Sequence, residues 1–143
     1  MRNFKNILSI FISAICVISC GIETDDKDEI YYLWTNAELP KDVLTINGKY
    51  WESGHFTKEY EVYIHLKPTV KWWNEFKKVN ELDSAKSNFS EDIILKLKPN
   101  YNRAINLPEW FKPNKNSTFY QKKDSEFYWN EKTKDLFIHE IQL

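Results

Sequence analysis

Apolar and polar residues alternate in the middle of the chain in a pattern that is typical of β-strands. The alternation runs from residue 59 to 67 and places four apolar side chains on one side of the strand: Tyr60, Val62, Ile64 and Leu66. The segment 42–51 is rich in β-branched and aromatic residues, and Ser53-Gly54 marks a turn after it. The two segments predict one long hairpin. Asn47-Gly48 would allow a tighter hairpin, but the long one keeps strands of ordinary length and is preferred.

The spacing of large apolar residues then changes to that of a helix. Thr69 follows a proline and suits the N-cap position. Apolar residues recur after it at intervals of three and four, at Trp72, Phe76, Val79 and Leu82. We therefore expect an amphipathic helix over 69–82 whose apolar stripe faces a core.

The second half of the chain combines a long loop with a closing hairpin. After a polar connector, residues 93–97 form either a short strand or the end of a longer helical region. Residues 99–117 contain three prolines and five asparagines without a period, and a loop of this length in a compact domain is often functional. Residues 126–129 and 136–142 predict a hairpin, with a strand at Phe119-Tyr120 just before it.

These elements predict a single α+β domain over residues 38–143. Its order is β-β-α-loop-β-β-β, and it would hold an antiparallel sheet of about five strands with one main helix on one face. The formal net charge of the chain is −1, which argues against nucleic acid as a partner because such proteins carry a basic face.

The first twenty residues have the pattern of an export leader. Arg2 and Lys5 precede an apolar stretch of twelve residues, Ile7 to Ile18. As a helix this stretch would span about 18 Å, which is short of the roughly 30 Å hydrocarbon core of a bilayer. It is therefore a poor permanent membrane span.

The end of this stretch resembles the lipobox of bacterial lipoproteins, in which an aliphatic residue and a small residue precede an obligatory cysteine. Val17, Ile18, Ser19 and Cys20 occupy the corresponding positions. The resemblance implies a signal peptide over 1–19, cleavage before Cys20, and diacylglyceryl and palmitate-type lipid on that residue. An ordinary secretory leader is the alternative, but Val17 fits poorly where such a leader needs a small residue. Two or more acyl chains would give stable membrane anchoring.

Residues 20–37 begin with an acidic run that predicts a flexible tether. Five acids occur in the nine residues from Gly21 to Glu29, and such a composition buries little apolar surface. The run is either a solvated spacer or an export tag, because it is similar to the acidic run that directs some lipoproteins to the outer face of the outer membrane. We therefore expect a protein anchored in the cell envelope, at the periplasmic or surface face of the outer membrane.

The residue types that can act as catalysts or metal ligands do not form a recognisable catalytic or metal-binding motif. Beyond Cys20 there is no thiol, so a disulfide framework or a thiolate metal site is not expected. The histidines lack metal-ligand spacing, and His139 is interpreted as a hydrogen-bonded core residue. The nucleophilic-serine motif Gly-x-Ser-x-Gly does not occur. Paired acids for glycoside hydrolysis stay open, with five candidates: Glu59, Glu61, Glu109, Glu126 and Glu140.

The segment 107–113 is the most distinctive part of the long loop. Trp110 and Phe111 are adjacent and lie between two prolines, so the pair forms either a lid folded back on the sheet or an anchor for a partner. This loop and the hairpin after it are similar to small bacterial lipoproteins of uncharacterised function, and that resemblance implies no activity. Trp34 and Trp51 suggest a platform for sugar rings.

The sequence therefore predicts a membrane-anchored lipoprotein that is not an enzyme and needs no cofactor or metal. We expect a protein-interaction module of the inhibitor, immunity or envelope-accessory type, held to the membrane by lipid on Cys20. A glycan-binding or glycan-processing surface module is the alternative.

Overall fold

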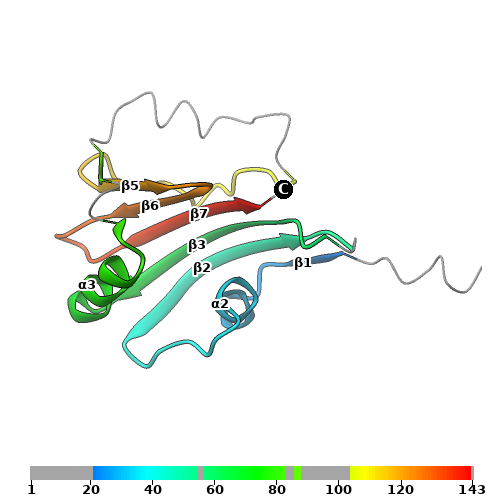
Figure 1. Cartoon of the computed structure of the whole chain (residues 1–143), viewed down its shortest axis with the longest axis horizontal. Helices are drawn as coiled ribbons and strands as arrows, with labels where there is room; N and C mark the ends of the chain where they lie inside the picture. The colour runs from blue at the N-terminus through cyan, green and yellow to red at the C-terminus, as the bar shows by residue number, and fades with distance from the viewer. Residues whose placement is uncertain (1–20, 55–56, 83–85, 88–103, 143) are drawn as a thin grey trace, which may run out of the picture.

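The computed structural model describes residues 21–54, 57–82, 86–87 and 104–142. These residues form one seven-stranded antiparallel sheet in the order β1-β2-β3-β7-β6-β5-β4 (Figure 1). The strands are β1 (Ile22–Thr24), β2 (Val43–Glu52), β3 (Tyr60–Pro68), β4 (Lys86–Ser87), β5 (Thr118–Lys122), β6 (Ser125–Trp129) and β7 (Leu136–Gln142). The helices are α2 (Lys27–Thr35) and α3 (Val70–Val79).

The predicted hairpins are confirmed. β2 and β3 pair along their whole length, with one bulge between Thr45 and Asn47, so the long hairpin is present and the tighter one is not. β6 and β7 form the closing hairpin, and β5 precedes it as expected. The possible strand at 93–97 lies outside the described residues.

The helix predicted after Thr69 is also confirmed. Oγ1 of Thr69 accepts a hydrogen bond of 3.2 Å from the backbone N–H of Trp72 and so caps the first turn. The helix ends at Val79, earlier than expected, because Asn80 forms its C-cap and Glu81 has a positive φ of 54°. Leu82 is nevertheless fully buried beyond the helix end.

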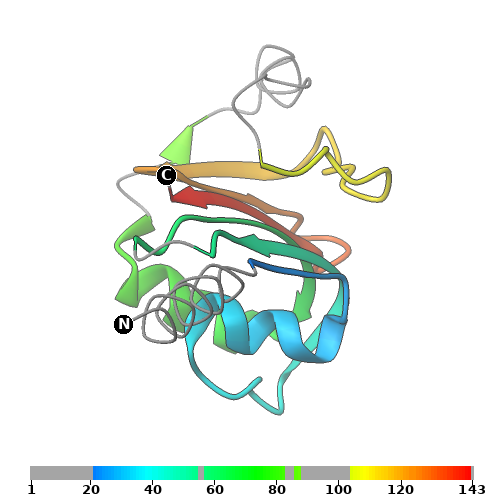
Figure 2. The same ribbon diagram turned by 90° about the vertical axis from the view of Figure 1, so that its right-hand side faces the viewer.

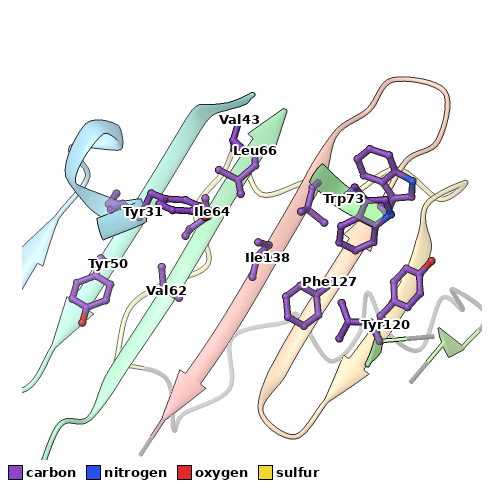
Figure 3. Close-up of a cluster of buried hydrophobic side chains, with 14 residues drawn as sticks. Tyr31, Val43, Tyr50, Val62, Ile64, Leu66, Trp73, Tyr120, Phe127 and Ile138 are labelled. Atoms are coloured by element: carbon purple, nitrogen blue, oxygen red, sulfur yellow. The ribbon is translucent and has the colours of Figure 1, made fainter. Parts of the chain in front are cut away.

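The sheet carries a different layer on each face. Both helices lie on one face, and the loop 104–117 lies on the other (Figure 2). The helical face holds the larger core, which joins Tyr31 of α2 and Trp73 of α3 to Ile64 and Ile138 of the sheet (Figure 3). The second face holds a smaller core of mainly aromatic side chains: Tyr63, Ile105, Phe111, Phe119, Tyr128 and Phe137. The α+β antiparallel architecture is as predicted.

The flexible tether predicted over 20–37 is wrong for residues 22–35, which form β1 and α2. The acids that suggested disorder instead stabilise a helix start. The Asp26 side chain caps the N-terminus by accepting from the backbone N–H of Asp28, and Asp28 and Glu29 occupy the positive first turn. Burial of Ile30 and Tyr31 then fixes the helix on the sheet.

The strand count also exceeds the expected five, because the short strands β1 and β4 extend the two edges of the sheet. Neither described helix has the length and apolar character that crossing a membrane would require.

Candidate functional site

The loop 104–117 is anchored to the sheet by Phe111. This side chain is 3% exposed, and its ring centroid lies 5.0 Å from that of Tyr63 and 5.5 Å from that of Phe137, both in edge-on contacts. A local turn supports it, because the backbone N–H of Phe111 donates to the carbonyl of Pro108 at 3.0 Å. Phe111 therefore belongs to the core of the second face, as the lid interpretation requires.

Trp110 is placed differently from its neighbour. It packs edge-on against Phe111 at 5.9 Å, remains partly exposed, and lines a cleft of about 510 Å³. The cleft lies between the loop and the β1–β2 edge of the sheet. Its lining residues are Glu23, Thr24, Asp25, Gly48, Lys49, Asn106, Leu107, Pro108, Glu109 and Trp110.

The cleft combines an aromatic side chain with an excess of negative charge. Three carboxylates line it, from Glu23, Asp25 and Glu109, against one ammonium group from Lys49. Lys49 already forms an ion pair with Glu23, in which its Nζ lies 3.6 Å from Oε1 of the carboxylate. A site of this size and composition suits a binding role, since a few polar groups around an apolar contact are what orient a ligand.

Beneath the loop, Glu61 forms the centre of a buried polar network. Its side chain is fully buried, and it accepts hydrogen bonds from the Tyr63 hydroxyl at 2.9 Å and the backbone N–H of Ile105 at 3.0 Å. Nε2 of His139 lies 3.2 Å from the same carboxylate. Glu61 on β3 therefore connects β7 and the start of the loop.

His139 joins Glu61 to a second carboxylate. Its Nδ1 lies 3.2 Å from Oε2 of Glu126, which also accepts from the Tyr128 hydroxyl at 3.0 Å. Because both ring nitrogens face carboxylates, the geometry favours the doubly protonated imidazolium. The interpretation of His139 as a hydrogen-bonded core residue is confirmed.

The pKa values of this network follow from its geometry. Burial by itself would lower the pKa of His139, but hydrogen bonds and charges from Glu126 and Glu61 outweigh burial and raise it. Burial would likewise raise the pKa of Glu61, but hydrogen bonds from His139, Ile105 and Tyr63 outweigh it and lower that pKa. The network is thus a charged cluster that holds strands and loop together.

The acids considered for glycoside hydrolysis do not gather in one cleft within the described structure. Glu61 and Glu126 meet at His139 inside the protein, whereas Glu109 lines the cleft. Glu140 contributes to the helical face, where it accepts hydrogen bonds from Ser125 at 2.7 Å and from Tyr60. Local sequence patterns carry no signal for the buried network, because Glu61 occupies a position that strand alternation assigns to a polar face.

Trp34 and Trp51 do not form a common platform for sugars. Trp34 packs with the core of the helical face, against Phe76 at 6.3 Å. Trp51 packs with the core of the opposite face. Each is therefore used separately in packing.

Cys20 and the lipobox positions Val17, Ile18 and Ser19 lie outside the described residues. Among the described residues, no group of three or more histidine, cysteine or acidic side chains is arranged to hold a metal ion. No protein-family model matches the chain, and no curated protein or solved structure matches it either.

Proposed function

We propose that this protein is a lipid-anchored, non-enzymatic interaction module of the cell envelope, and that the cleft beside Trp110 is its recognition surface. The observation that carries the proposal is the contrast between two adjacent aromatic residues. Phe111 is buried and fixes the loop, whereas Trp110 stays partly exposed in the wall of a cleft.

The contacts that hold the loop on the sheet fix the shape of this cleft before a partner binds. Phe111 inserts among aromatic rings of the sheet, and the Ile105 N–H bonds to a buried carboxylate. A surface that is ordered before binding loses less conformational entropy on association. Tryptophan in such a place is a frequent energetic centre of protein interfaces.

A binding role is also favoured over catalysis by the position of the titratable groups. The Glu61–His139–Glu126 network is the arrangement in the described structure that most resembles acid–base machinery. However, Glu61 and His139 are buried, Glu126 is only partly exposed, and none of the three lines the cleft. Its hydrogen bonds join β3, β7 and β6 through His139 and reach the loop through the Ile105 N–H, and the Tyr63 and Tyr128 hydroxyls add bonds within their own strands.

Affinity capture from detergent extracts of the native envelope tests the proposal. The full lipidated chain, a Trp110→Ala variant and a Tyr32→Ala variant would serve as baits. Tyr32 is a matched control because it is an aromatic residue with 54% exposure that lies on α2 and does not line the cleft. We expect a protein that the parent and Tyr32→Ala retain and Trp110→Ala loses. Repeated recovery of no partner, or one unaffected by Trp110→Ala, contradicts the proposal.

A second candidate is glycan binding, which the composition of the cleft favours. An indole beside Asn106, Asp25 and Glu109 offers an apolar surface together with acceptors and donors for sugar hydroxyls. A glycan array separates the two candidates. Specific sugar binding that disappears in Trp110→Ala would support this second function over a protein partner.

A further inference from the structure

We infer that the partner of the Trp110 cleft presents an arginine-bearing, extended peptide segment. The inference rests on the proposed function and names the chemistry of its partner. It starts from charge. The segment 23–29, which forms the sheet edge and helix start at the cleft, carries five acids and only one basic residue, Lys27. Glu109 adds a carboxylate from the loop wall.

Two of these carboxylates, those of Asp25 and Glu109, are available to a partner. Asp25 and Glu109 are exposed, and the only cation that lines the cleft, Lys49, is 3.6 Å from Glu23. A recess lined by an excess of one charge concentrates the field and attracts a ligand of opposite charge. An anionic partner would meet repulsion here.

The aromatic wall makes arginine the best fit among cationic groups. A guanidinium can stack on an indole face and also form paired hydrogen bonds with carboxylates. The protein uses its own lysines over aromatic rings elsewhere, with Nζ of Lys134 lying 5.9 Å from the Trp129 ring centroid and Nζ of Lys77 lying 5.7 Å from that of Trp73. Among the described residues no lysine or arginine lies over the Trp110 ring, so a partner's cation could stack on it in the cleft.

The edge of the sheet explains why the segment should be extended. β1 pairs only with Tyr50, Trp51 and Glu52 of β2. Gly48 and Lys49, the adjacent residues of β2, line the cleft instead. β1 ends at Thr24, opposite Tyr50, and Asp25 and Asp26 lead from it into α2. A peptide would therefore lie between this turn and the loop, across Gly48 and Lys49. An extended segment suits this course, because it can offer main-chain hydrogen bonds to the sheet edge while the pocket binds one of its side chains.

A pair of matched peptides tests the inference on the full lipidated chain in detergent. The first probe is an acetylated, amidated hexapeptide of alternating alanine and arginine. The second replaces each arginine by citrulline, which has nearly the same shape but no charge. We expect the arginine peptide to bind with at least about tenfold higher affinity, measured by titration calorimetry, and to weaken as salt is added. Equal affinities, or no measurable binding of either peptide, would overturn the inference.

Variants locate the binding. Asp25→Asn and Glu109→Gln should each weaken the arginine peptide about fivefold, and Trp110→Ala should abolish its advantage over citrulline. Glu75→Gln is the control, because Glu75 is an exposed acid on α3 that does not line the cleft. An equal loss in Glu75→Gln would mean diffuse attraction to an acidic surface and would overturn the inference.

The same variants separate this inference from the proposed function. A captured envelope protein could depend on Trp110 and still be retained by Asp25→Asn and Glu109→Gln. In that case the proposed interaction surface is supported, and the inference of an arginine-bearing segment is wrong. Specific sugar binding that is lost in Trp110→Ala would also contradict the inference of an arginine-bearing peptide segment. If Trp110→Ala retains every captured protein, the proposed function itself fails.

Discussion

Oε1 of Glu61 lies 3.2 Å from Nε2 of His139, and both side chains are buried between the sheet and the loop that covers it. The pair joins the neighbouring strands β3 and β7. Through the Ile105 N–H it also holds the start of the loop that carries Trp110. This charged contact therefore contributes both to the stability of the sheet and to the shape of the candidate cleft.

Replacing Glu61 by glutamine should destabilise the protein by about 3 kcal/mol, because it removes one of the two carboxylates that compensate the buried charge of His139 and weakens the hydrogen bonds from Tyr63 and Ile105. The free energy of unfolding would be measured by chemical denaturation. Glu75→Gln, on the exposed side of α3, should change it by less than about 0.5 kcal/mol. Similar effects of the two substitutions would show that the Glu61–His139 contact contributes little.

The stability of the protein should be greatest between about pH 4.5 and about pH 6.5. The pKa of His139 is raised in the folded state. Its contribution to the free energy of unfolding is therefore complete below its unfolded pKa of 6.5 and is lost as the pH rises through the folded pKa. The pKa of Glu61 is lowered in the folded state. Its contribution to the free energy of unfolding is therefore complete above its unfolded pKa of 4.5 and is lost as the pH falls through the folded pKa.

Denaturation between about pH 3 and about pH 9 checks this window. In a His139→Gln variant the decline on the alkaline side should flatten, because the group whose proton is lost there has been removed. An unchanged alkaline decline in that variant would assign the titration to another group.

The two adjacent aromatic residues of the loop should respond differently to truncation. Phe111→Ala removes a buried ring and should cost about 3–5 kcal/mol of unfolding free energy. Trp110→Ala should cost much less, because the side chain is partly exposed, yet it should abolish capture of the partner. Stability and capture would be measured on both variants. A larger stability loss in Trp110→Ala would reverse the roles assigned here.

The fold was largely predictable because its main elements carry strong local signals. The alternation in β3 and the cap at Thr69 are properties of neighbouring residues, and they hold wherever the segment packs. For the same reason Trp110 and Phe111 could be singled out together. Their different roles could not, because burial of Phe111 depends on Tyr63 and Phe137, which are distant in the sequence.

The missed features depend on tertiary packing that outweighs local composition. The acidic run before Ile30 has the composition of a disordered segment, but Asp26 caps a helix and Ile30 is completely buried. Strand alternation assigned Glu61 to a polar face, yet the loop covers that face and the residue is buried. Only the three-dimensional arrangement shows that both faces of the sheet are covered.

The close approach of α2 to the sheet leaves little room for a side chain at position 48. A Cβ added there would lie 2.5 Å from Cδ1 and 3.0 Å from Cγ2 of Ile30. Gly48→Ala should therefore push the helix away from β2 and destabilise the protein by about 1–3 kcal/mol. Adding Ile30→Val removes the closest atom, so the double variant should lose less stability than the two single losses combined. Strict additivity in this cycle would show that the two residues are not coupled.

Anchoring by lipid on Cys20 can be tested by substitution at two cysteines of the leader. Cys20→Ser removes the only sulfur at the lipobox position and should abolish labelling by radioactive palmitate, while Cys16→Ser makes the same change four residues earlier and should leave labelling intact. The label is a better measure than sedimentation, because an uncleaved apolar leader could itself retain some protein at the membrane. If the parent takes up no label, or if Cys16→Ser loses it while Cys20→Ser keeps it, lipid on Cys20 is wrong and the attachment proposed for this domain must be replaced.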